Sequence, residues 1–322
     1  MTMSNTESRP PEVTCAEGAQ GAGVQILTAR EVPLGGPRAL LVRRTLPQRA
    51  RTLIGAWCFA DHYGPDTTPM IVPPHPHTGL QTVSWLFDGE IEHRDSGGHH
   101  QFVRPGELNL MTGGHGISHS EVSTRSGEIL HGVQLWVALP DSARHAPRDL
   151  QFHVPEPVRA NGAVARVFLG SVPGVASSPV RTFTPLLGAE LVLDPGTTFE
   201  LPLDETFEHG VLLDQGAVTV AGTPVKEAEL AYLAPRRASV ELRAGDDAPA
   251  RMLVLGGPPF GDEIVMWWNF VARSHDEIVE YRADWEAGSE RFGRVDGYRG
   301  EPSRLPAPPL PNVVIKPRRN PT

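Results

Sequence analysis

Cysteine is nearly absent from this chain of 322 residues, which contains only Cys15 and Cys58. Two cysteines cannot build the disulfide framework of a secreted domain, and this usage is typical of a reducing compartment. No apolar run approaches the roughly 20 residues that span a bilayer, and the first ten residues lack the apolar core of a signal peptide. We therefore expect a cytoplasmic protein with no membrane partner.

Positive charge is also scarce, because 29 Lys and Arg residues stand against 38 Asp and Glu residues, for a net charge of −9. Residues 316–319 form the only locally basic stretch, which we interpret as a solvated terminus. A protein that binds a phosphate backbone needs clustered Lys and Arg. We therefore expect no direct nucleic-acid partner.

Turn-forming residues are abundant, with 33 glycines and 32 prolines. Between them lie short apolar and β-branched runs, such as residues 82–87, which end at the hairpin signal Asp88-Gly89. Such runs recur from residue 24 to 139 and again from 165 to 255, on either side of a stretch rich in Pro and Arg. The pattern predicts an all-β protein of many short strands.

This pattern divides the chain into four parts. Residues 1–22 have no apolar periodicity, which predicts a flexible N-terminal tail. Two β domains follow, at residues 23–145 and 146–292. The Pro-rich residues 293–322 form a C-terminal tail that we expect to lie extended over the surface or to fray.

A single short helix is well marked near the end of the second domain. Ser274 at the N-cap and Glu277 three residues later form a capping box, and Gly288 is a stop signal. One face of the helix carries three large residues, namely Ile278, Tyr281 and Trp285. We expect this face to pack on a β-barrel.

The strongest chemical signal is a pair of matched motifs, His75-Pro76-His77 and His119-Ser120-Glu121. On an extended strand, residues i and i+2 point to the same face. His75, His77, His119 and Glu121 can therefore face one barrel interior and bind a metal ion. Three imidazoles and a carboxylate suit Fe²⁺, Mn²⁺, Ni²⁺, Cu²⁺ or Zn²⁺, and leave two positions open on a six-coordinate ion.

A weak internal repeat predicts that only one barrel carries this site. The turns at residues 88–89 and 214–216 follow similar apolar runs, which indicates two copies of one β-barrel unit. On the offset that aligns these turns, Pro202 and Asp204 take the places of the first histidine pair. His209 stands alone nearby, and we interpret it as a surface or packing residue.

Several segments together resemble the pirin family of the cupin superfamily. They are HPHTGLQTV at residues 75–83, GEIEHRDS at 89–96, MTGGHGISHSE at 111–121, FADHYGP at 59–65, GVQLWVALP at 132–140, and GGP and WNFV at 256–258 and 268–271. The resemblance implies a bicupin, in which two cupin-type β-barrels pack face to face and the N-terminal barrel holds one metal, usually iron. It implies His75, His77, His119 and Glu121 as the ligands.

The resemblance implies two different functions. Some pirins are associated with quercetin 2,3-dioxygenase activity, so we expect an Fe²⁺-dependent enzyme acting on a small aromatic or enolic substrate and dioxygen. Other pirins are regulators, and the alternative is a redox-sensing protein that binds a partner protein without turnover. A purely structural role for the metal is a third reading. Because two barrels in one chain already provide a paired arrangement, we expect a monomer.

Other residues near the motifs receive separate roles. Glu121 is expected to act as general base, and His115 on the glycine-rich bend as a proton carrier or substrate contact. His93 is interpreted as a strand-surface residue. Gln81 is neutral where the commoner pirin wording has Glu, so the charge near the substrate is expected to differ from that in relatives.

Overall fold

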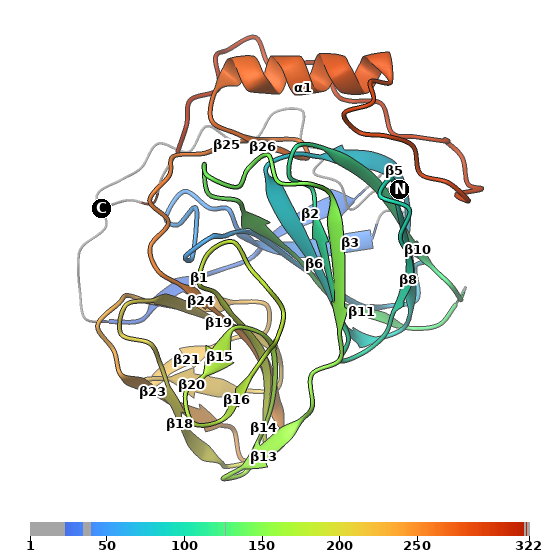
Figure 1. Ribbon diagram of the computed structural model, residues 1–322. Coiled ribbons are helices and arrows are strands. Elements are labelled where there is room, and N and C mark those ends of the chain that lie inside the picture. The colour runs from blue at the N-terminus through green and yellow to red at the C-terminus, as the bar shows by residue number, and fades with distance from the viewer. Residues whose placement is uncertain (1–22, 35–39, 126, 319, 321–322) are drawn as a thin grey trace.

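The computed structural model describes residues 23–34, 40–125, 127–318 and 320, so the tail expected over residues 1–22 lies outside the described residues. The described chain is built of β-strands with one α-helix, and it forms two cupin-type barrels, as predicted (Figure 1). No helix among the described residues is long and apolar enough to cross a membrane.

The first barrel consists of a seven-stranded and a four-stranded antiparallel sheet. The larger sheet contains β2 (Arg30–Leu34), β3 (Leu40–Leu46), β4 (Trp57–Asp66), β6 (Leu80–Asp88), β9 (Leu108–Thr112), β11 (Leu130–Ala138) and β12 (Asp149–His153). The smaller sheet contains β5 (Ile71–His77), β10 (Ile117–Ser123), β7 (Ile91–Asp95) and β8 (His100–Val103), in that spatial order. The smaller sheet carries both metal motifs.

The second barrel repeats this arrangement of seven and four strands. Its larger sheet contains β1 (Gln25–Leu27), β13 (Val158–Ala160), β14 (Ala163–Leu169), β17 (Leu187–Leu193), β19 (Glu208–Gln215), β22 (Leu230–Leu233) and β24 (Ala250–Gly257). Its smaller sheet contains β18 (Thr198–Pro202), β20 (Val218–Val220), β21 (Thr223–Val225) and β23 (Ser239–Ala244). A hairpin of β15 (Ser171–Val172) and β16 (Ala176–Ser177) lies beside β14 and β17 of the larger sheet.

The two larger sheets pack against each other through one apolar cluster that draws residues from both barrels. The Trp85 and Phe168 rings stack at 4.5 Å between centroids, and the Trp85 indole N–H donates to Glu190 at 2.8 Å. Strand β1 pairs with β22 of the second barrel, and β12 pairs with β9 of the first. The barrels therefore share segments, and a domain division at residue 145 stays a proposal.

Helix α1 (His275–Ala287) begins and ends where the sequence predicts. The Ser274 hydroxyl accepts from the Glu277 N–H, and Gly288 adopts the left-handed conformation. The Glu277 carboxylate accepts from the Arg273 N–H at 2.7 Å, one residue before the position that a capping box uses. The hydrogen bond of Ser274 and the backbone conformation of Gly288 thus confirm the N-cap and the stop signal.

The buried face of α1 does not rest on a barrel sheet, which corrects the expected docking site. It packs on a separate hairpin, β25 (Val265–Trp267) and β26 (Phe270–Ala272), in a cluster that includes Trp267 and Phe270. Phe270 forms a bridge with Thr78, so this hairpin covers the end of β5 (Figure 1). The Trp-rich hairpin supplies an apolar surface of its own, which is why the helix packs there.

The described residues of the C-terminal tail are held in place by hydrogen bonds. The Leu305 N–H donates to the Pro74 carbonyl at 2.9 Å, and Ile264 pairs with Arg318. The Asn320 side chain accepts from the Leu53 N–H at 2.8 Å. The contacts of Leu305 and Asn320 tie the tail to the first barrel, and the contact of Arg318 ties it to the segment before β25.

We predict that Gly79→Ala destabilises the protein more than Gly98→Ala. Both glycines have positive φ (+67° and +89°), but a Cβ at Gly79 would lie 2.2 Å from the Val271 carbonyl, whereas Gly98 has open space. The conformational cost is about 1 kcal/mol for each, and overpacking adds roughly 2 kcal/mol at Gly79. Denaturant unfolding of the two variants measures the difference, and equal free energies of unfolding would contradict the close approach of β26.

We also predict that the buried ring of His209 makes folding acid-sensitive. His209 is 1 % exposed, which settles its role as a packing residue, and burial lowers its pKa to about 4. The unfolded chain binds a proton there first, so this stability is full above about pH 6.5 and is lost as the pH falls towards 4. The contribution is on the order of 3 kcal/mol.

His209→Gln should flatten the dependence of unfolding free energy on pH between 6.5 and 4. The matched control is His100→Gln, because the His100 side chain is 42 % exposed. Both variants are compared with the parent protein in the presence of a chelator. A slope in His209→Gln equal to that of the parent would show that His209 is not kept neutral by the fold.

Candidate metal centre

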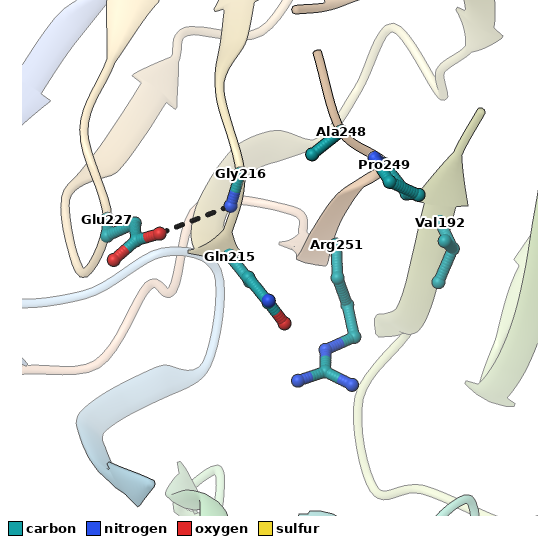
Figure 2. Close-up of a pocket in the computed structure, with 7 residues that line it drawn as sticks. All are labelled: Val192, Gln215, Gly216, Glu227, Ala248, Pro249 and Arg251. Carbon is teal, nitrogen blue, oxygen red and sulfur yellow. Dashed lines mark hydrogen bonds between the residues drawn. The ribbon is translucent and has the colours of Figure 1, made fainter. Parts of the chain in front are cut away.

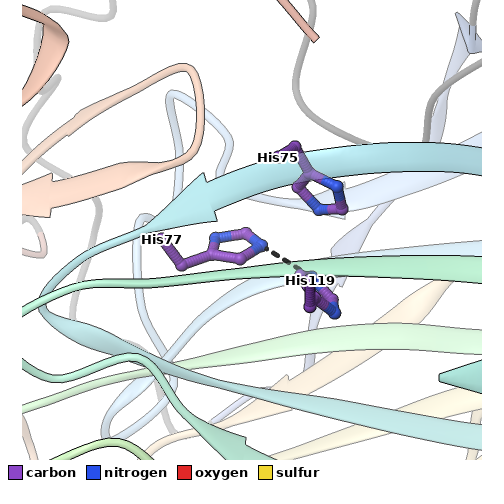
Figure 3. Close-up of side chains that lie close together, drawn as sticks. All are labelled: His75, His77 and His119. Carbon is purple, nitrogen blue, oxygen red and sulfur yellow. Dashed lines mark hydrogen bonds between the residues drawn. The ribbon is translucent and has the colours of Figure 1, made fainter. Parts of the chain in front are cut away.

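Three histidines converge inside the first barrel from two paired strands. His75 and His77 lie on β5, His119 lies on β10, and the register places His119 directly opposite His75. All three are at most 2 % exposed, and their candidate ligand atoms lie within 4.8 Å of one another. The Nε2 atoms of His77 and His119 are 3.1 Å apart (Figure 3).

The outer nitrogens of the first pair fix the direction of their inner lone pairs. His75 Nδ1 lies 2.9 Å from the Pro73 carbonyl, and His77 Nδ1 lies 3.0 Å from the Asn269 carbonyl. A carbonyl only accepts hydrogen bonds, so each Nδ1 carries the proton and each Nε2 is a bare acceptor. This orientation is the one that metal-binding histidines adopt.

The three imidazoles are also in the protonation state that binds metals. Burial lowers the pKa of His75 to about 4 and lowers the pKa of His77 and His119 well below the usual value. All three are therefore uncharged at neutral pH, as a ligand must be. Three uncharged imidazoles whose ligand atoms converge in one buried space are a donor set that fits a metal ion.

Glu121 shares His119 as a neighbour but is not part of the group formed by His75, His77 and His119. It belongs to a group with His93 and His119, and its carboxylate accepts from the Ser84 hydroxyl at 2.7 Å. A register shift between His119 and Glu121 breaks the regular alternation with β5. Burial raises the pKa of Glu121. The structure thus brings three of the expected ligands together and places the fourth beside them.

His93 is a site residue that sequence reasoning missed. The expected strand-surface position is wrong, because His93 is fully buried and its ring lies 5.1 Å from that of His119. Ile91, His93 and Asp95 are buried on one face of β7, whereas Glu92 and Arg94 are more exposed. The period-two pattern starting at the apolar Ile91 was the signal that could have found it.

His115 and Gln81 lie outside the histidine groups. His115 is exposed on the bend before β10, where its ring is 6.2 Å from that of His145, and partial burial together with Arg291 lowers its pKa. Gln81 is fully buried, and its amide donates to the Thr112 hydroxyl at 3.0 Å.

A second histidine cluster joins the two barrels. Asp214 Oδ1 of the second barrel lies 2.6 Å from His62 Nε2 and 2.7 Å from His131 Nε2 of the first. Both Nε2 atoms must donate to this one carboxylate oxygen. Burial alone would raise the pKa of Asp214, but hydrogen bonds from His131 and His62 lower it.

The Nδ1 atoms of His62 and His131 lack the hydrogen-bond acceptors that metal-binding histidines have. His131 Nδ1 faces the Arg251 guanidinium, a donor, at 3.4 Å, and His62 Nδ1 has no hydrogen-bond partner among the described residues. A metal-binding imidazole needs an acceptor at that position. The cluster is therefore a hydrogen-bonded clamp between barrels, and no sequence pattern pointed to it because its members are far apart in the chain.

A cavity of about 440 Å³ lies on the second barrel, beside the turn after β19 (Figure 2). Its lining includes Arg251, Gln215 and Glu227, and the Glu227 carboxylate accepts from the Gly216 N–H at 3.2 Å. None of its lining residues belongs to the His75, His77 and His119 group. The cavity is thus separate from the candidate metal centre.

Comparisons with known proteins agree with this architecture. Residues 39–137 match the pirin family, and residues 188–293 match the pirin C-terminal cupin domain. The crystal structure of quercetin 2,3-dioxygenase from Acinetobacter baumannii is 37 % identical, covers 91 % of this chain and 97 % of its own, and superposes with a TM-score of 0.85.

Two relatives are similar over most of the chain. A Pseudomonas aeruginosa protein described as "Putative quercetin 2,3-dioxygenase PA1205" is 43 % identical over 96 % of this chain and 98 % of its own. A pirin-like protein of Caulobacter vibrioides is 36 % identical over 84 % of this chain and 96 % of its own. With two cupin-type barrels, both family matches and these relatives, the chain belongs to the pirin family.

Proposed function

We propose that this pirin is a metal-dependent dioxygenase that opens flavonol-type substrates such as quercetin. The observation that carries the proposal is the set of three buried, uncharged imidazoles, two of which have their Nδ1 atoms fixed on carbonyls. The description of a 43 % identical relative and of a 37 % identical crystal structure as quercetin 2,3-dioxygenases supports the reaction class.

The ion would be held by His75, His77 and His119, with Glu121 as a fourth ligand. We propose Fe²⁺, although the same nitrogen and oxygen donors also suit Ni²⁺, Mn²⁺, Cu²⁺ and Zn²⁺. When bound, such an ion supplies Lewis acidity and open positions for the substrate oxygens and for dioxygen. The remaining chemistry falls to side chains of the chain itself.

Glu121 is the residue that we propose as general base. Its raised pKa makes its carboxylate a better proton acceptor than an exposed one, and the Ser84 hydroxyl holds the carboxyl group in place. It would accept the proton of the enolic hydroxyl of the substrate. His115, which is exposed on the glycine-rich bend, would contact the substrate at the mouth of the site.

Oxygen uptake is the test of this proposal. We expect Fe²⁺-loaded protein to consume dioxygen when quercetin is added, in proportion to the bound iron counted in the same sample. His119→Ala should lose most of the metal and the uptake, and it should keep the fold because each barrel has an apolar cluster of its own. His100→Ala, at an exposed position on the same sheet, is the matched control.

Full metal content in His119→Ala would refute the ligand assignment. A fully loaded parent protein that takes up no dioxygen with quercetin would refute quercetin as a substrate and favour another substrate or the regulatory alternative.

Glu121→Gln removes the proposed base and keeps an oxygen that can still bind the ion, so the rate is counted per bound metal ion. The Gln amide oxygen can still accept from Ser84, but it cannot take up a proton at neutral pH. We expect kcat per bound metal ion to fall by about 10²-fold or more, because general base catalysis contributes on that scale. An unchanged kcat per metal ion would show that the base is another group.

A further inference from the structure

We propose that His93 is a positioning residue that holds the imidazole of His119 from behind, and that Asp95 orients His93 for this role. The inference rests on the proposed metal centre and extends it to strand β7. It assigns a purpose to a buried histidine that the expected ligand set does not use.

The contact is built by the pairing of β10 with β7. In this register Asp95 is opposite His119, and His93 is opposite Glu121. The Nδ1 atoms of His93 and His119 face each other at 3.4 Å. Because His93 is fully buried and His119 is 1 % exposed, water does not compete for this contact.

The position of the proton on His93 follows from its other neighbour. His93 Nε2 lies 3.2 Å from Asp95 Oδ2, and a carboxylate accepts, so Nε2 carries the hydrogen. A neutral imidazole protonated at Nε2 has a bare lone pair at Nδ1. His93 thus offers an acceptor to His119 Nδ1, whose N–H donates to it and leaves His119 Nε2 bare on the side of His77.

All three imidazoles of the centre then follow one rule. The outer Nδ1–H meets the Pro73 carbonyl in His75, the Asn269 carbonyl in His77 and the His93 ring in His119. Acceptors at this position fix the tautomer and the ring orientation of a metal ligand. The acceptor for His119 is a side chain, so it can be changed by mutation without breaking the backbone.

Asp95 is itself firmly anchored. Its Oδ1 accepts from the Gly97 N–H at 2.8 Å, the His99 N–H at 3.1 Å and His99 Nδ1 at 3.0 Å. These donors come from the turn between β7 and β8. Oδ2 contacts His93 Nε2 at 3.2 Å and also lies 3.1 Å from His99 Nδ1. The orientation of His119 is therefore set by a surface turn on the same sheet.

One other geometry would place the same residues in a different role. His93, His119 and Glu121 have candidate ligand atoms within 4.8 Å of one another, so His93 could itself be a ligand. That arrangement would take the Nδ1 side of His119 and leave His75 and His77 outside the ion. The carbonyl partners of those two histidines favour the first arrangement, and the experiment distinguishes the two.

The test is a Co²⁺ titration of the full chain, followed by visible absorption and by competition with a chelator. The parent should bind one ion with nitrogen ligands. His93→Leu removes the acceptor and should weaken Co²⁺ binding by about 10- to 100-fold and shift the visible bands. His93→Gln, whose amide oxygen can accept from His119, should restore most of the affinity and the parent spectrum.

Controls separate positioning from structure. The control is His100→Leu on the neighbouring strand β8, which removes an exposed imidazole away from His119. Unfolding in chelator shows whether His93→Leu is folded at the assay temperature, and a folded His93→Leu with parent affinity and spectrum would overturn the inference. Loss of one nitrogen ligand in both His93 variants, seen by pulsed EPR on the Cu²⁺ forms, would overturn it by making His93 a ligand. A parent protein that binds no Co²⁺ would instead refute the metal centre.

Discussion

The position of β10 between β5 and β7 is the constraint on which the candidate site depends. Pairing with β5 sets His119 opposite His75, and pairing with β7 sets His119 opposite Asp95 and beside His93. The His119 imidazole therefore has neighbours from the strands on both sides of β10. A slip of one residue in either pairing would turn His119 to the other face of the sheet and remove it from the site.

Both histidine clusters are buried, and they differ in the hydrogen-bond partners of their nitrogens. Around His75 and His77 the outer partners are carbonyls, which force the bare nitrogen inwards. Around Asp214 the inner nitrogens must carry the hydrogens, because they donate to a shared carboxylate. Residue types and short distances are similar in both clusters, so the proton positions are what separate a ligand set from a clamp between barrels.

The sequence predicted features that depend on short-range periodicity. The i, i+2 spacing found His75 and His77, and the N-cap and stop signals found α1. Features that depend on distant partners were not predictable: the clamp at Asp214, the hairpin under α1 and the register shift before Glu121. His93 is an intermediate case. The alternating burial along β7 was predictable from the sequence, but the contact of His93 with His119 was not.

The carbonyl that orients His77 belongs to Asn269, 192 residues later in the chain. During synthesis the first barrel leaves the ribosome long before the hairpin that contains Asn269. A nascent first barrel consequently has His77 without its outer partner, so the centre reaches its final geometry only after the hairpin has docked at Thr78. The outer partner of His77 is thus supplied by one of the last segments of the chain to be synthesised.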